Sequence, residues 1–192
     1  MLAGGMLRAP ALTRASNFGS NTASGGTPAH ACDYSAFSQC IANDGLHHYY
    51  YSAVEQRQQG YIDYACASVY EPVADVSCSE AAGSSGADVY VYDNTYFSQY
   101  WAWTACYSTA TFGGADPNKW CKPQALRFDL SNQTGFDTPA EGRYLGCHEF
   151  GHTLGLRHSY DTNSCMFTGQ ATTSVITTHD ASTLNSHYEI PD

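Results

Sequence analysis

The chain is 192 residues long, which suits a single domain with a substantial buried core. Its 18 acidic residues against 8 basic ones give a formal net charge of −10, and a surface of that sign would repel nucleic-acid phosphates and anionic lipid headgroups. No uninterrupted apolar run approaches the length of a transmembrane helix, so length and composition argue against a nucleic-acid-binding protein and against a membrane-spanning one.

The first 31 residues are rich in Gly, Ser, Thr, Asn and Ala and lack hydrophobic periodicity. This composition indicates a flexible tail or the remnant of a pro-segment. We expect one folded domain over residues 32–192, without internal repeats, and we expect it to be a monomer.

The next part of the chain predicts a helix followed by strands. A capping-box pattern from Ser52 to Glu55 predicts a helix that runs to about Val69 and that Pro72 ends. Alternation of apolar and polar residues then predicts strands. One sheet with two or three helices is an α+β arrangement. The predicted strands cover residues 73–78, 87–92, 100–107 and 124–130.

Two groups of conspicuous side chains fall in or near these elements. His47 and His48 are adjacent, so on an extended chain they point to opposite sides and suit a single metal ion poorly. We expect a surface or strand-edge position for both histidines. Tyr100, Trp101 and Trp103 could form a binding platform, but packing against the sheet is the interpretation that we favour.

Another helix is predicted directly before the most informative part of the chain. Thr138 offers an N-cap hydroxyl, Pro139 suits the first helical position and Glu141 completes a capping box. Gly155 falls where this helix should end, because glycine tolerates the left-handed conformation of a C-terminal cap. A last helix is predicted over about residues 178–187.

The pattern HExxHxxGxxH occupies residues 148–158. His148 and His152 are four residues apart, so they lie one turn apart on the same face of a helix. A turn at Gly155 would bring His158 back toward the same point. Three imidazoles can fill three corners of a zinc tetrahedron and leave the fourth for a water, from which Glu149 can take a proton. The pattern therefore predicts metal-assisted hydrolysis, most naturally of peptide bonds.

Two simpler explanations compete with this prediction. A solvated helix face with an incidental histidine pair would account for HExxH, but not for the added helix stop and third histidine. A purely structural zinc site usually closes all four positions with protein ligands, often cysteines. The one thiol next to a predicted ligand is Cys147, which we assign to a disulfide.

The segment resembles the zinc signature of the metzincin metalloendopeptidases, and most closely that of the matrix metalloproteinase-like (matrixin) branch. Ser159, directly after the third histidine, matches the matrixin choice, and Met166 lies where the family has its Met-turn. The resemblance implies one catalytic zinc ion, a general base and acid, and a hydrophobic floor beneath the metal. By position, the zinc ligands are His148, His152 and His158, the base is Glu149 and the floor is Met166.

The resemblance also implies a fold: a mixed twisted β-sheet with an active-site helix, a second long helix and a C-terminal helix, and zinc in the cleft between upper and lower subdomains. Residues 148–166 match specifically, whereas 87–91 and 125–129 resemble matrixin core strands more loosely. The chain departs from the family in lacking the His-rich loop for a second zinc and the cysteine-switch motif. Phe167–Gly169 replaces the usual Pro-x-Tyr, so the wall of the specificity pocket must be built differently. The sequence does not determine whether the protein also binds calcium.

Eight cysteines without any CxxC pair indicate disulfides in an exported protein rather than metal thiolates. Residues 1–13 show no evident signal peptide, but the cysteine content favours an extracellular location. Eight cysteines allow 105 connectivities. We predict sequential pairing of Cys32 with Cys40, Cys66 with Cys78, Cys106 with Cys121, and Cys147 with Cys165.

Together these features predict a secreted zinc-dependent endopeptidase whose catalytic domain spans residues 32–192 and whose substrates are proteins or peptides. One alternative is a catalytically silent extracellular module that keeps zinc for stability, and another is a peptidase of a different metzincin branch. Glu149 argues against the silent module, because a purely structural site has no use for a base.

Overall fold

Within the part of the chain that the structure describes, five strands form one mixed sheet in the spatial order β2-β1-β3-β5-β4. Its first four members run parallel, and β4 pairs antiparallel with β5 at one edge. The computed structural model describes residues 40–114, 119–169 and 171–188, so the predicted tail over residues 1–31 lies outside the described residues. The strands are β1 (Leu46–Tyr51), β2 (Ser77–Glu80), β3 (Val89–Asn94), β4 (Ala102–Gly113) and β5 (Trp120–Asp129).

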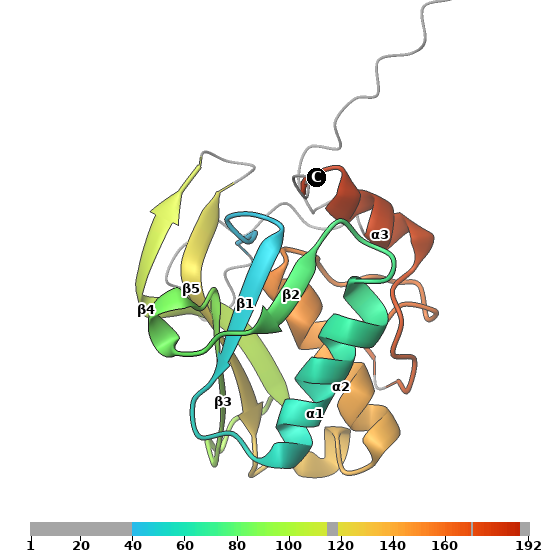
Figure 1. The fold of residues 1–192 in the computed structure, drawn as a ribbon. Helices are drawn as coiled ribbons and strands as arrows, with labels where there is room; N and C mark the ends of the chain where they lie inside the picture. The colour runs from blue at the N-terminus through green and yellow to red at the C-terminus, as the bar shows by residue number, and fades with distance from the viewer. Residues whose placement is uncertain (1–39, 115–118, 170, 189–192) are drawn as a thin grey trace, which may run out of the picture.

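Among the described residues, three α-helices accompany the sheet, and α1 and α2 lie side by side in contact with each other (Figure 1). A π-helical segment continues α1 without a break, which confirms the predicted second long helix over most of its length. The α+β class is confirmed. The helices are α1 (Gln56–Tyr64), its π-helical continuation (Ala65–Tyr70), α2 (Pro139–Thr153) and α3 (Thr178–Asn185), and two 3-10 turns occupy Ser84–Gly86 and Gln133–Gly135.

The main core lies between the sheet and α1 and α2. Successive side chains of a strand point to opposite faces, so alternate residues of the central strands enter this core. Val89 and Val91 of β3 and Leu126 of β5 are fully buried there. Phe150 of α2 packs against Tyr49 of β1, with ring centroids 6.0 Å apart, and against Tyr70, with ring centroids 5.5 Å apart. This packing fixes α2 against the sheet along the segment that carries the HExxH motif.

The sequence does not predict β1, and the expectation of a surface or edge position for His47 is wrong. β1 lies between β2 and β3, and His47 is fully buried on the face that meets α2. Its Nε2 lies 2.8 Å from the hydroxyl of Thr153, and that hydroxyl donates to the carbonyl of Phe150. His48 points the other way, is partly exposed and contacts Ser79.

We expect His47 to make the fold acid-sensitive. Burial lowers the pKa of His47 from 6.5 to about 4, so below pH 6.5 the unfolded chain binds a proton that the folded chain does not. The free energy of unfolding should therefore fall by about 3 kcal/mol as the pH drops from 6.5 to below 4. In His47→Gln the fall in the free energy of unfolding that His47 causes should be missing. Urea unfolding at pH 7 and at pH 4.5, with chelator present, would measure this difference. His179→Gln, a change at an exposed histidine of α3, should keep the wild-type slope, and equal slopes in all three proteins would contradict the prediction.

Element boundaries also differ from the sequence prediction. Helix α1 begins at Gln56 and not at Ser52, because the chain is still turning at Ala53, where φ is +58°. The backbone N–H of Glu55 donates to Asp93 at 2.7 Å, and Glu55 makes no side-chain cap. Strand β2 begins four residues later than predicted, at Ser77. Here contacts between distant parts of the chain override the local pattern.

Three of the predicted disulfides are present: Cys66–Cys78, Cys106–Cys121 and Cys147–Cys165. The predicted partner of Cys40, at position 32, lies outside the described residues. Cys147–Cys165 links α2 to the segment that contains Met166 across 18 residues of chain.

Removal of this last disulfide by the double change Cys147→Ala and Cys165→Ala is expected to lower the free energy of unfolding by about 3 kcal/mol, because the unfolded chain regains the freedom of the closed loop. Denaturation by urea of the metal-free proteins would measure the difference. The matched control is the Cys66→Ala and Cys78→Ala pair, which closes a shorter loop of 12 residues and should cost slightly less. Unchanged stability of the first variant would contradict the expectation.

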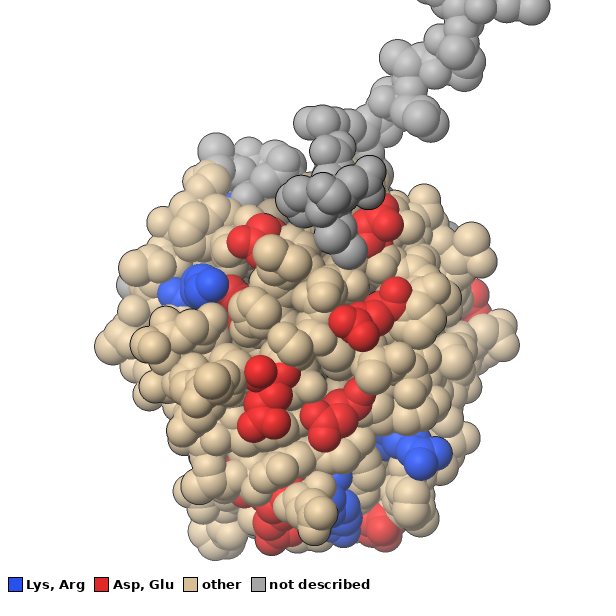
Figure 2. Space-filling model, viewed as in Figure 1, with Lys and Arg blue, Asp and Glu red and all other residues tan. Residues whose placement is uncertain are grey.

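The visible surface agrees with the charge balance of the sequence. The face drawn in Figure 2 shows more acidic than basic side chains, scattered among uncharged ones. Within the described ranges, none of the helices combines the length and apolar character needed to cross a membrane.

Candidate active site

The local structure of α2 follows its sequence. The hydroxyl of Thr138 accepts the backbone N–H of Glu141, and the Glu141 carboxylate accepts the backbone N–H of Thr138, so the predicted capping box is formed. At the other end the chain leaves the helix at Gly155, where φ is +94°. A Cβ at this position would also lie 2.8 Å from a side-chain carbon of Ile41. Both the conformation and the lack of space favour glycine, and the chain turns back there.

This turn brings the three predicted histidines together. Ring nitrogens of His148, His152 and His158 all lie within 4.8 Å of one another. The ring centroids of His158 are 5.1 Å from those of His148 and 4.9 Å from those of His152. Two of the rings come from α2 and are buried, whereas His158 follows the turn and is exposed. The ring nitrogens of the three imidazoles therefore lie close enough together to bind one metal ion.

Backbone carbonyl groups orient the two buried rings. The Nδ1 of His148 lies 2.7 Å from the carbonyl oxygen of Cys165, and the Nδ1 of His152 lies 2.6 Å from that of Leu156. Each Nδ1 must therefore carry the hydrogen, which leaves each Nε2 with a lone pair. The two Nε2 atoms are only 3.1 Å apart. Two acceptors cannot hydrogen-bond to each other, so this close pair suits a shared cation, and the carbonyls act as the outer partners that metal-binding histidines usually have.

Burial also keeps these rings neutral. Desolvation lowers the pKa of His148 to about 3, with a further contribution from the nearby His158, and the hydrogen bond to Cys165 only partly opposes it. Burial likewise lowers the pKa values of His152 and His158. Neutral imidazole is the form that binds a metal, so no proton has to be displaced from these groups at neutral pH.

Glu149 lines the same cavity as His152 and His158. Its side chain is 4% exposed, and its carboxylate oxygen Oε2 accepts a hydrogen bond of 3.1 Å from the hydroxyl of Thr104 on β4. Burial raises the pKa of Glu149 to about 8, and the hydrogen bond from Thr104 acts in the opposite direction. A carboxyl group with a pKa near neutrality can both accept and release a proton, as general acid–base chemistry requires.

Met166 lies fully buried against α2. A Cβ on Gly151, which is in the helical turn between the two α2 histidines, would lie 2.4 Å from the Met166 sulfur. The carbonyl of Met166 accepts the backbone N–H of Ser159 at 2.6 Å, which ties the segment after His158 to the methionine. The sulfur also lies 3.7 Å from the hydroxyl of Tyr70. Met166 thus packs beneath the part of α2 that carries the histidines.

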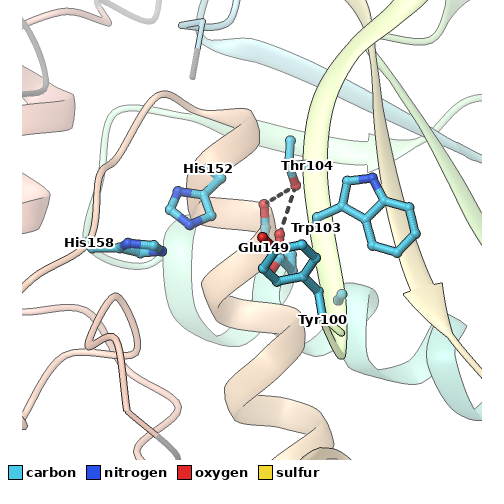
Figure 3. A pocket seen from close by; sticks show the side chains of 7 residues that line it. Tyr100, Trp103, Thr104, Glu149, His152 and His158 are labelled. Carbon is cyan, nitrogen blue, oxygen red and sulfur yellow. Dashed lines mark hydrogen bonds between the residues drawn. The ribbon is translucent and has the colours of Figure 1, made fainter. Parts of the chain in front are cut away.

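Two adjoining cavities, of about 300 Å³ and 350 Å³, open beside Glu149 and His158. Figure 3 shows the first of them. Glu149 is the one acidic side chain on their walls among the described residues, and no Lys or Arg lines them there. The hydroxyl of Tyr144 lies 2.6 Å from the carbonyl oxygens of both Phe167 and Gly169, and so holds the segment that stands in place of the family's Pro-x-Tyr. The remaining wall residues come from β4 and the residues directly before it, from α2, and from Thr168.

The expectation that Tyr100 and Trp103 pack against the sheet is wrong in part, because both line the first cavity and Tyr100 is 39% exposed. Trp101 is partly buried and packs against the core, and it also lines the second cavity. Sequence reasoning also missed Thr104 and the carbonyl of Cys165. Thr104 carries no motif, and backbone carbonyls leave no signal in a sequence, so neither could be found before the fold was known.

The chain is similar to known proteins in part of its sequence and in its fold. The family model described as matrixin matches residues 92–189, about half of the chain. No curated protein matches the chain. Among solved structures the fold is similar to that of myroilysin, with 13% sequence identity and a TM-score of 0.50 over 79% of this chain and 96% of that one. A second myroilysin structure gives the same identity and TM-score over 77% and 85% of the two chains. A weaker likeness, with a TM-score of 0.38 and 16% identity over 71% and 56%, is to high choriolytic enzyme 1, a hatching enzyme zinc-protease from the medaka fish Oryzias latipes.

Proposed function

The chain belongs to the matrixin family of metallopeptidases, and from that premise we propose that it is a secreted, zinc-dependent endopeptidase. The observation that carries the proposal is the approach of three neutral imidazoles to one point, with the Glu149 carboxyl group directly beside them. A purely structural site would have a fourth protein ligand and no use for a base. A hydrolytic site also needs a base, and Glu149 supplies one.

The donor set fits zinc. His148, His152 and His158 would hold the ion through imidazole nitrogens, which are common zinc ligands, and three protein ligands are typical of catalytic rather than structural sites. When bound, zinc lowers the pKa of a water molecule and polarises a carbonyl group. Met166 would support the ligands from below, because it packs against α2 between them.

Glu149 would act as the general base and then as the general acid. Its carboxylate would take a proton from the attacking water and later give that proton to the nitrogen of the leaving amine. The group would thus end the cycle in the state in which it began. Its buried position beside Thr104 supports this role, because a buried carboxyl group exchanges a proton near neutral pH more readily than an exposed one.

The substrate would bind along β4. This strand is at an edge of the sheet, so an extended peptide can pair with it as an added strand. Apart from Glu149 and the histidines, the described walls of the two cavities are apolar or uncharged, with Tyr100, Trp103 and Leu145 among them. Such walls favour apolar side chains next to the cleaved bond. An extracellular location is supported by the three disulfides that lie within the described residues.

The test combines zinc quantification with cleavage of a peptide library by the full chain, purified under oxidising conditions. We expect one zinc per chain and internal cleavage that a chelator abolishes and added zinc restores. Cleavage that persists after complete removal of metal would refute zinc dependence. A protein that holds one zinc, unfolds on its removal and cleaves nothing would instead be the silent zinc-stabilised module.

A further inference from the structure

Thr104 joins the edge strand β4 to the predicted base. The hydroxyl of Thr104 lies 3.1 Å from Oε2 of Glu149 and also 3.1 Å from the backbone oxygen of the same residue (Figure 3). We propose that Thr104 is a positioning residue for peptide hydrolysis, which holds the Glu149 carboxylate in the orientation that the reaction needs. This inference rests on the proposed function.

The Glu149 side chain needs such a partner. A glutamate side chain has several rotatable bonds, so holding it in one orientation costs conformational entropy. Among the residues that the structure describes, no other donor bonds to its carboxylate, and the site is buried enough that the contact is not replaced by bulk water. A bond to Oε2 leaves Oε1 as the oxygen that would face the water.

Thr104 is itself well fixed. It lies within β4, paired with Leu126 of β5, and it is 7% exposed. Its β-branched side chain has few allowed rotamers. The hydroxyl contacts α2 at two points of one residue, so the relative position of strand and helix determines where the carboxylate lies. The substrate would pair with the same strand. Thr104 would therefore fix the position of the Glu149 carboxylate relative to the bound peptide.

A valine in place of Thr104 would fill nearly the same volume but could not donate the hydrogen bond. In Thr104→Val we expect kcat for peptide cleavage to fall roughly 10- to 100-fold, the range that corresponds to losing a hydrogen bond to a charged group. KM should change by less than about twofold, since the lost contact serves the reaction and not substrate binding. Thr104→Ser keeps the hydroxyl and should restore most of kcat.

The experiment compares these variants with wild type and with Thr183→Val, using the full zinc-loaded chain, and records kcat, KM, zinc content and thermal stability. Thr183 is a matched control on α3, a buried threonine whose hydroxyl donates to the backbone carbonyl of His179 and which lines neither cavity. Thr183→Val should leave kcat unchanged. Selective loss of kcat in Thr104→Val, rescued by Thr104→Ser at full zinc content, would support the inference.

Three outcomes would overturn it. Thr104→Val could retain wild-type kcat, Thr104→Ser could be as slow as Thr104→Val, or kcat could fall only together with zinc content and stability. Each of these leaves the proposed function intact, provided that the wild type shows cleavage that a chelator abolishes. If the wild type shows no such cleavage, the proposed function fails first and the role of Thr104 fails with it.

Discussion

Replacement of Glu149 by Gln is expected to lower kcat for peptide cleavage roughly 100- to 10,000-fold, the contribution that a positioned general acid–base group typically makes. Glutamine has nearly the same shape, and its amide oxygen can still accept the hydrogen bond from Thr104, but it cannot take a proton from water. The three imidazoles are unaltered, so zinc content and thermal stability should stay close to the wild-type values. Steady-state kinetics and zinc quantification on one sample would measure both effects.

The matched control for this variant is Glu141→Gln in the first turn of the same helix. A glutamine can replace the glutamate of a capping box, so activity and stability should resemble those of wild type. A Glu149→Gln protein that turns over substrate at the wild-type rate would refute the role of Glu149. Loss of zinc along with activity would show that Glu149 supports the metal site and not the proton transfer.

Replacement of His158 by Ala is expected to remove zinc and, with it, all measurable cleavage. His158 is the exposed member of the cluster and lies beyond the turn at Gly155, so its loss leaves only the two imidazoles of α2. Zinc affinity should fall by more than the roughly 10- to 100-fold that removal of an outer-shell partner costs. Competition with a chromophoric chelator would give the affinity directly.

His179→Ala is a suitable control, because it removes an exposed histidine of α3 that is not in the cluster. Zinc affinity and cleavage should be unchanged in that protein. A His158→Ala protein with one tightly bound zinc would contradict ligation by His158, and the mechanism proposed above would need another third ligand.

Local signals in the sequence predicted the parts of the fold that depend on local interactions. The capping box at Thr138 and Glu141 predicted the start of α2, because each partner of that motif lies within one turn. Alternation of side chains predicted β3 and β5 to within a few residues, since their apolar residues face one core. The disulfide prediction was confirmed for three pairs that each close a short loop.

The errors came from contacts between distant residues. Nothing near His47 indicates that it will be buried, because its partner Thr153 is 106 residues away. The same holds for Thr104, whose bond to Glu149 spans 45 residues. The start of α1 depends on Asp93, which lies on strand β3. The pattern in the sequence therefore indicated residues that the structure brings together, but it did not indicate the residues that orient them.

Cys165 connects a disulfide to one of the three clustered imidazoles. This residue forms the disulfide with Cys147, the immediate neighbour of His148, and its carbonyl group accepts the hydrogen bond from the His148 ring. Reduction of that single bond would loosen both ends of the contact that aims an imidazole at the shared point. We therefore expect metal capture to be completed only after oxidative folding, so that a newly made chain in a reducing cytosol would stay inert toward the proteins around it.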